Sequence, residues 1–270
     1  MMLSASRASL AQVEDLLVQR RSDPSFAGLA AELYSACDLL GGEKALREAL
    51  SDSGRSERTR TEIVSSLFAD RLTALAVEVL QTTVRMRWSD ADDLVAGTRI
   101  LGDQAAFLAA ADNGTLEATE DEIFRIGRAV AGSATLQTAL TDPAISASAK
   151  VGIVTDLLAG RTTDTTSQVV GFTLSHLHGR RIEQAIDELV DLAAAQRQRM
   201  VAVVRVARPL DADLTERMTA ALRSLTGRTI TLNVVVDPSV LGGAHVTVGG
   251  EVIDGTVATR LTEAARTIAD

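Results

Sequence analysis

The sequence predicts an α+β protein that is mostly α-helical, with two duplicated helical bundles followed by a small C-terminal α/β domain that has a short mixed sheet and two helices. Three observations predict this class. Apolar residues recur at steps of three and four up to about residue 200, one helical segment occurs twice, and beyond Met200 the apolar period changes to two. The expected domains are 1–112, 113–200 and 201–270.

Helical periodicity is clearest in "RIEQAIDELVDLAAA", where Ile182, Ile186, Leu189 and Ala193 form one apolar stripe. Similar patterns occupy roughly 4–20, 25–40, 57–68, 71–86, 89–111, 119–131, 146–158 and 164–178. Only 4 prolines interrupt the 270 residues, and aromatic residues make up 3%, so Ala, Leu and Val must do most of the packing. This composition favours helix bundles.

An internal repeat is visible within the helical part. The segment 45–68 aligns with 135–158 at a constant offset of ninety residues. The paired positions include Leu46 with Leu136, Asp52 with Asp142, Arg60 with Lys150 and Ile63 with Ile153. Chance agreement between two amphipathic helix pairs is the alternative. The shared turn, the shared Asp and the shared basic position favour a duplication.

The C-terminal region begins with a strand in "VAVVRVARPL", which Pro209 ends. A helix follows in "DADLTERMTAALRSLTG", for which Asp213 is the expected N-cap and Gly227 the expected C-terminal glycine. In "RTITLNVVVD" the apolar residues alternate, as in a half-buried strand. "AHVTV" and "EVID" are then two short strands, and a final helix is expected after Asp254.

Two Gly-Gly pairs in this region raise the question of a phosphate-binding loop. Such a loop needs glycines that open a helix, and for a P-loop a Gly-Lys-Ser/Thr sequence. Here a strand follows Gly242-Gly243, and Gly249-Gly250 separates two short strands, as in a hairpin. We therefore expect these glycines to serve the backbone rather than a cofactor.

Charge and motif content exclude several function classes. The net charge of −9 argues against a general nucleic-acid surface. No apolar run is long enough for a membrane span, and the start does not read as a signal peptide. The single Cys37 excludes an internal disulfide, and His176 and His178 lack the companions of a metal site. We expect no cofactor, no metal and no active site.

The C-terminal pattern of strand, "DPSVLGG", strand, turn, "VIDGTV" and helix resembles the signature of the delta subunit of F-type ATP synthase, whose mitochondrial counterpart is the oligomycin-sensitivity-conferring protein. The matching positions are Asp237, Leu241, Gly242, Gly243, Val252, Ile253, Asp254, Gly255 and Leu261. "LHGRRIEQAIDELVDL" and "AAELYSACDLL" are also similar to segments of that family. The departure is the duplicated bundle, a form expected of actinobacterial members.

The resemblance implies a non-catalytic stator subunit of the peripheral stalk. In that family the helical domain grips the N-terminal helices of alpha subunits, and the C-terminal domain holds the C-terminal end of the b-type stalk. The head then does not turn with the rotor during proton-driven ATP synthesis. The implied location is the cytoplasmic face of the plasma membrane, as a peripheral part of the complex, and a separate b partner is expected.

Candidate partner contacts are Arg85, Arg87, Trp88, Arg180 and Arg181, because Arg and Trp are over-represented at interface hot spots and the last two head a helix as in the family. The alternative function is a free-standing cytosolic helical adaptor with a delta-like C-terminal domain. An enzyme with an unrecognised site is a third hypothesis, for which the sequence offers no catalytic cluster. Which bundle meets alpha, and what the duplicated block adds, stays open at this point.

Overall fold

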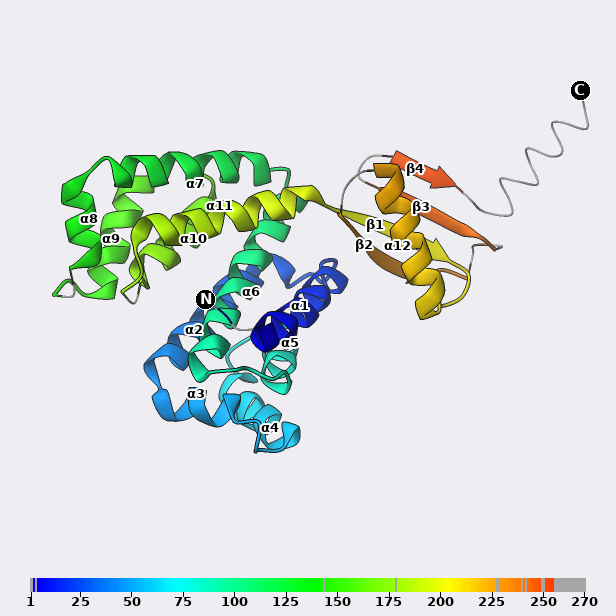
Figure 1. Ribbon diagram of the computed structural model, residues 1–270, viewed down its shortest axis with the longest axis horizontal. Helices are drawn as coiled ribbons and strands as arrows, with labels where there is room; N and C mark the ends of the chain where they lie inside the picture. The colour runs from blue at the N-terminus through cyan, green and yellow to red at the C-terminus, as the bar shows by residue number, and fades with distance from the viewer. Residues whose placement is uncertain are drawn as a thin grey trace, which may run out of the picture. The chain divides into compact units, whose positions relative to one another are not determined.

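The computed structural model describes residues 2, 4–142, 144–177, 179–226, 229–238, 240, 242–248 and 251–254. The chain divides into two compact units, Met1–Gln196 and Arg197–Asp270. The first unit is built of helices, and the second contains a sheet (Figure 1). The predicted class, α+β and mostly α with duplicated bundles, is confirmed.

The helical unit follows the predicted segments closely. Its elements are α1 (Ser4–Gln19), the short 3₁₀ helix η1 (Phe26–Gly28), α2 (Leu29–Gly42), α3 (Lys44–Ser51), α4 (Glu57–Phe68), α5 (Ala74–Arg85), α6 (Ala91–Asp112), α7 (Leu116–Ala131), α8 (Ala134–Thr141), α9 (Ala147–Leu158), α10 (Asp164–Ser175) and α11 (Ile182–Gln198). Within the described residues, none of these helices is both long and apolar enough to cross a bilayer.

The internal repeat extends over the whole helical unit. Helices α3, α4 and α5 begin and end 90 residues before α8, α9 and α10. The caps repeat as well. The hydroxyl of Thr73 accepts from the Ala76 N–H at the start of α5, and Thr163 does the same for Thr166 at the start of α10. Such matched helix bounds and caps support a duplication over a chance likeness.

A pair of carboxylates at the same spacing completes these caps. Glu32 on α2 accepts hydrogen bonds from the backbone N–H and the hydroxyl of Thr73. Glu122 on α7 accepts the equivalent two bonds from Thr163. The spacing therefore matches α2 with α7, and it matches α1 with residues 94–109 of α6.

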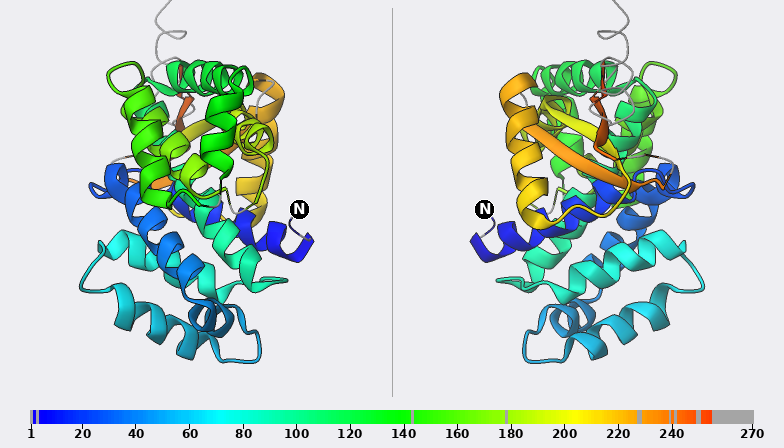
Figure 2. Two further views of the ribbon diagram at one scale, coloured as in Figure 1. Left: turned by 90° about the vertical axis from the view of Figure 1, so that its left-hand side faces the viewer. Right: turned by 90° about the vertical axis from the view of Figure 1, so that its right-hand side faces the viewer.

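Helix α6 belongs to both repeats. It is the last helix of the first repeat (α1–α6) and, through residues 94–109, the first helix of the second repeat (α6–α11). Figures 1 and 2 show it running from one group of helices to the other. Residues 101–108 are buried all round, as expected of a helix that packs on several sides. The division into separate domains 1–112 and 113–200 stays a prediction, and residue 112 ends this shared helix.

The second unit has the predicted order of strand, helix, strand and hairpin. Its elements are β1 (Arg199–Val206), α12 (Ala212–Thr226), β2 (Thr229–Val236), β3 (Ala244–Val248) and β4 (Glu251–Asp254). The strands lie in the order β2-β1-β3-β4, with β1 and β2 parallel and the other pairs antiparallel. Among the residues of this unit whose placement is described, six form a buried cluster: Ala202, Val204, Val206, Leu222, Ile230 and Val246.

One capping prediction in this unit is wrong. The carboxylate of Asp211, not that of Asp213, accepts from the Leu214 N–H at the start of α12. Asp213 lies in the first turn, 3.8 Å from Arg217. The helix begins at Ala212, so the earlier Asp has the geometry of a cap. The predicted Gly227 cap and the final helix lie outside the described residues.

Candidate functional site: the junction of the two helical repeats

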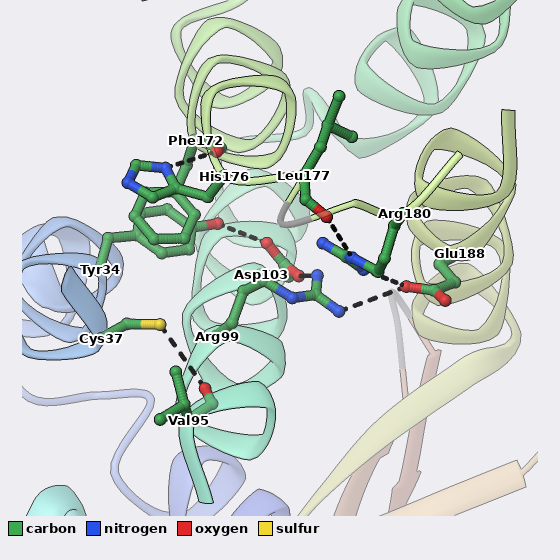
Figure 3. A network of polar contacts seen from close by, with 10 residues as sticks. All are labelled: Tyr34, Cys37, Val95, Arg99, Asp103, Phe172, His176, Leu177, Arg180 and Glu188. Carbon is green, nitrogen blue, oxygen red and sulfur yellow. Dashed lines mark hydrogen bonds and ion pairs between the residues drawn. The ribbon is translucent and has the colours of Figure 1, made fainter. Parts of the chain in front are cut away.

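Three aromatic rings connect α2 of the first repeat to α10 of the second (Figure 3). The ring of Tyr34 stacks on that of Phe172, with centroids 4.2 Å apart, and Phe172 stacks on the imidazole of His176 at 4.3 Å. Gly102 on α6 makes room for this stack. A Cβ there would lie 2.6 Å from the Tyr34 ring, so any larger residue would displace it.

A buried ion pair lies directly beneath the stack. Asp103 on α6 is 0% exposed, accepts from the Tyr34 hydroxyl at 2.7 Å, and pairs with Arg99 one turn earlier at 2.6 Å. Burial raises the pKa of Asp103 to about 6, although Arg99 and the Tyr34 hydroxyl oppose that shift. Burial also raises the pKa of Tyr34, so its hydroxyl remains a hydrogen-bond donor.

Two further charges extend this pair to α11. Glu188 on α11 lies 3.3 Å from Arg99 and 2.9 Å from Arg180, which follows α10. Burial and the neighbouring Arg99 lower the pKa of Arg180, while Glu188 opposes that shift. The chain of charges therefore ties α6 to α11 within the second repeat, and Tyr34 joins it to the first.

The imidazole of His176 closes the junction at its outer edge. Its Nε2 lies 2.9 Å from a carboxylate oxygen of Asp38 on α2, and its Nδ1 lies 2.9 Å from the carbonyl oxygen of Phe172. The hydrogen bond with Asp38 raises the pKa of His176 above its ordinary value, although partial burial opposes the shift. Sequence reasoning takes His176 as the polar end of a helix, and α10 does end beside it.

A groove of about 600 Å³ opens beside this junction. Cys37, Val95, Phe172 and Arg180 are among the residues that line it. The thiol of Cys37 donates to the carbonyl of Val95 at 3.5 Å, and burial raises its pKa to about 12, so it is a packed thiol rather than a nucleophile. No cluster of metal-ligating side chains occurs among the residues that the structure describes. The arrangement is chemically suited to holding helices together.

The candidate contacts near the end of α5 differ in exposure. Arg85 and Arg87 are exposed, and the carbonyl of Arg87 accepts from the hydroxyl of Ser9 on α1. Trp88 is only 7% exposed, and its indole N–H donates to the carbonyl of Thr83. Its ring fills the space above Gly97, where a Cβ would lie 2.4 Å away. A partner contact by these residues stays a prediction.

The candidate contacts Arg180 and Arg181 also differ in exposure and in their ion-pair partners. Arg180 is half-buried in the charge chain with Glu188, whereas Arg181 is exposed and lies 3.7 Å from Glu183. Their contact with a partner stays a prediction.

The family-signature residues lie in the second unit. The Asp237 N–H donates to the Val206 carbonyl, and Gly242 and Gly243 have φ of 136° and 79°, which few other residues adopt. The backbone of Val252, Ile253 and Asp254 forms β4. Leu241, Gly255 and Leu261 lie outside the described residues.

The junction residues Tyr34, Asp103 and Phe172 were not predicted as a site. One signal was available for Asp103, because "RILGDQAAFLAAA" places an Asp in the middle of an otherwise apolar helix. A carboxylate there needs a buried partner, and Arg99 stands four residues earlier on the same face. Nothing in the sequence indicates that Tyr34 and Phe172 would meet.

Comparison with known proteins gives a consistent result. The family model described as "ATP synthase delta (OSCP) subunit" matches residues 104–268. The ATP synthase subunit delta of Streptomyces griseus is 40% identical over 270 residues, which are 99% of this chain and 100% of that protein. That of Salinispora tropica is 40% identical over 273 residues, 100% of this chain and 99% of that protein.

A solved chain from the mitochondrial ATP synthase hexamer of Toxoplasma gondii is 21% identical, with a TM-score of 0.26, and covers 62% of this chain and 95% of its own. A score that low supports no structural argument. The sequence relatives confirm the predicted role as a stator subunit of the ATP synthase. The chain belongs to the ATP synthase delta (OSCP) subunit family.

Proposed function

We propose that this chain joins the b-type stalk to the N-terminal helices of the alpha subunits, and that the first helical repeat makes the alpha contact. It has no active site of its own in this proposal, and it works at the cytoplasmic face of the membrane as a peripheral part of the complex. The observation that carries the proposal is that one face of the second repeat is already covered by a helix, while the matching face of the first repeat is open.

The covered face lies between α6 and α10. Helix α2 packs along α6 and places Tyr34 over Gly102 and against Phe172. The face therefore already holds a helix with an aromatic anchor. An additional partner helix would have to displace α2 before it could bind here.

The matching face of the first repeat lies between α1 and α5, 90 residues earlier. Gln12 stands in the place of Gly102 and is exposed, and Thr82 stands in the place of Phe172 and is half-buried. At the end of α1, Arg20 pairs with Glu78 of α5 at 2.6 Å, so a polar contact borders this face. Such a face suits an amphipathic helix, and α2 on the second repeat is an example of the kind of occupant that fits it.

The exposed Arg85 and Arg87 lie at the C-terminal end of α5 beside this face. In the proposal they pair with carboxylates on the incoming alpha helix, while the buried Trp88 packs beneath the segment that carries the two arginines. Arg181 directly precedes α11 of the second repeat, so it is not assigned to the α1–α5 face.

The C-terminal unit is proposed to hold the end of the b stalk. Strand β2 lies at one edge of the sheet, and its residues Val235 and Val236 are 39% and 46% exposed. An apolar segment of b that covers these side chains would remove them from water. Two modules on one chain then bind the same assembly with a gain in avidity.

Calorimetric titration of the alpha N-terminal peptide into the whole chain tests the proposal. The chain is not cut at residue 112, because the shared α6 would lose one of its two sets of partners. We expect a stoichiometry of one, and loss of binding in the double variant Gln12→Arg, Thr82→Arg. The control Phe124→Arg changes an exposed apolar residue on α7, which is 55% exposed, and should bind normally.

Two outcomes would contradict the proposal. Normal binding by the double variant would exclude the α1–α5 face. No binding by the folded wild-type chain would favour a free adaptor over a stator subunit that contacts alpha through this peptide.

A further inference from the structure

Phe124 on α7 is the most exposed large apolar side chain among the residues that the structure describes, at 55%. A single exposed apolar residue is ordinary on a protein surface and by itself indicates nothing. What distinguishes Phe124 is its position, because it lies 90 residues after Tyr34 and takes the place of that residue in the second repeat. Tyr34 anchors α2 on the face between α6 and α10. Phe124 is therefore the anchor of a contact that the described residues do not complete.

The contact made by α2 shows what such an anchor binds. Tyr34 and Asp38 lie four residues apart on α2, and Phe172 and His176 lie four residues apart at the end of α10. The rings of Tyr34 and Phe172 stack at 4.2 Å, and the Asp38 carboxylate lies 2.9 Å from the imidazole Nε2 (Figure 3). Each helix contributes an aromatic ring and, one turn later, a polar group. The two rings and the two polar groups meet in matched pairs.

On α7 the same two positions are occupied by Phe124 and Arg128, which are both exposed. Arg128 stands in the place of Asp38, so the charge at the second position is reversed in sign. Arg128 has no ion-pair partner among the residues that the structure describes, whereas its neighbour Arg125 pairs with Asp121. A helix that covers this surface therefore needs a large apolar side chain and, one turn away, a carboxylate.

A second copy of this chain does not meet that requirement. Its α6–α10 face is already covered by α2. On its α1–α5 face, Thr82 and Met86 stand in the places of the ring and the imidazole of α10. Glu78, the carboxylate of α5, already pairs with Arg20 next to the end of α1. The charge and the side chains of α7 therefore favour a helix from a different protein.

We propose that the α7 surface formed by Phe124 and Arg128 docks an acidic amphipathic helix of another protein, with a large apolar side chain against the ring and a carboxylate against the guanidinium. The inference rests on the proposed function in one respect: the α1–α5 face is left to alpha, so this helix belongs to another subunit of the assembly. The helical unit then binds two foreign helices, one on the face of its first repeat and one on α7 of its second.

Photo-crosslinking from α7 in the assembled ATP synthase tests this surface. Phe124 is replaced by p-benzoylphenylalanine, which keeps an aromatic ring at the position, and mass spectrometry locates the crosslinked residue. The control position is Ala129, which is exposed on another side of α7. We expect position 124 to crosslink to a helix of a subunit other than alpha, close to an Asp or Glu, and position 129 to give no such crosslink.

Charge reversal tests the pairing at Arg128. Arg128→Glu should lower the crosslink yield from position 124 by about fivefold or more, because an ion pair becomes a like-charge contact. Replacement of the identified carboxylate by Arg should restore the yield in that variant. Arg125→Glu is the matched control, since Arg125 is exposed on the same helix but pairs within the chain, and it should leave the yield within about twofold of wild type. Circular dichroism identifies any variant that has lost its helices.

Three results would overturn the proposal. They are a yield from position 124 no higher than that from 129, a crosslink only to alpha or to a second copy of this chain, and a yield that Arg128→Glu lowers no more than Arg125→Glu does. Crosslinks from Gln12 and Thr82 in the same complexes measure the proposed function separately. Alpha captured there, with nothing captured at 124, would remove this inference alone. A non-alpha helix captured at 124, with no alpha at Gln12 or Thr82, would remove only the proposed alpha face.

Discussion

The two helical repeats have the same helices in the same order, yet they differ at the face that each presents beside its first helix. In the second repeat, Gly102, Asp103 and Phe172 receive Tyr34 from α2. In the first repeat, the corresponding positions are Gln12, Val13 and Thr82, and no aromatic stack is built there within the described residues. The duplication kept the helix pattern and caps, whereas the surface changed from an open face to an internal contact.

The largest expected effect comes from the buried charge that distinguishes the two faces. Asp103→Ala leaves the guanidinium of Arg99 without its buried partner and the Tyr34 hydroxyl without its acceptor. We expect the free energy of unfolding of the helical unit to fall by about 3–5 kcal/mol. Urea denaturation followed by circular dichroism measures it, and a loss below about 1 kcal/mol would show that the pair does not stabilise the junction.

The carboxyl group of Asp103 is expected to make the free energy of unfolding depend on pH. Val13, at the matching position of the first repeat, has no titratable group. Because the folded-state pKa of Asp103 is raised from 3.8 to about 6, the folded state binds this proton more tightly than the unfolded state, and the stability gained from it is fully present below pH 4 and is lost as the pH rises to 6. We expect the midpoint of urea unfolding to fall over this window. Asp103→Asn should remove that part of the slope, and an unchanged slope would contradict the assignment.

The aromatic stack of the second repeat predicts a smaller difference in stability between matched substitutions in the two repeats. Phe172→Ala removes the ring between Tyr34 and His176 and should cost about 2 kcal/mol, less than a fully buried Phe because the ring is half-buried. The matched change Thr82→Ala in the first repeat should cost about 0.5 kcal/mol or less. Equal losses of unfolding free energy at the two sites would mean that the aromatic stack does not stabilise the second repeat.

Glycines test whether the close approach of α2 is required. Gly102→Ala forces its Cβ against the Tyr34 ring, and overpacking of about 1–3 kcal/mol exceeds the helix-propensity gain of about 1 kcal/mol. Gly152→Ala on α9 meets no atom within 4 Å and should stabilise the unit. Thermal unfolding of the two variants should therefore shift in opposite directions.

The smallest expected effect concerns what the repeats share. Thr73→Ala and Thr163→Ala each remove an N-cap and the hydroxyl that donates to Glu32 or Glu122. We expect a loss of about 1 kcal/mol at Thr73 and a somewhat larger loss at Thr163, because the hydroxyl of Thr163 also lies within hydrogen-bonding distance of those of Thr119 and Thr166. A smaller loss at Thr163 than at Thr73 would contradict this reading of the caps.

Much of the fold could be predicted because it depends on local patterns. The 3.6-residue periodicity located the helices, and the ninety-residue offset located the repeat. The change to a period of two located β1, and the two glycines between valine-rich strands indicated the hairpin of β3 and β4. The glycine pair Gly242-Gly243 was correctly expected to serve the backbone, as its positive φ angles require.

The junction could not be predicted, because it is formed by long-range contacts. Tyr34 and Phe172 are far apart in the chain, and each alone is typical of an ordinary helix core. The sharing of α6 by both repeats was hidden for the same reason: one long periodic segment reads as one helix, whatever packs against it. Asp103 was the single local clue, as a carboxylate within an apolar stretch.

Photo-crosslinking in the assembled ATP synthase tests the proposed position of the alpha contact. A photoreactive residue is introduced at Gln12 or Thr82, with the exposed Phe124 on α7 as the control position. We expect crosslinks to alpha from Gln12 and Thr82 and none from Phe124. Crosslinks to alpha from Phe124, with none from either α1 or α5, would contradict it.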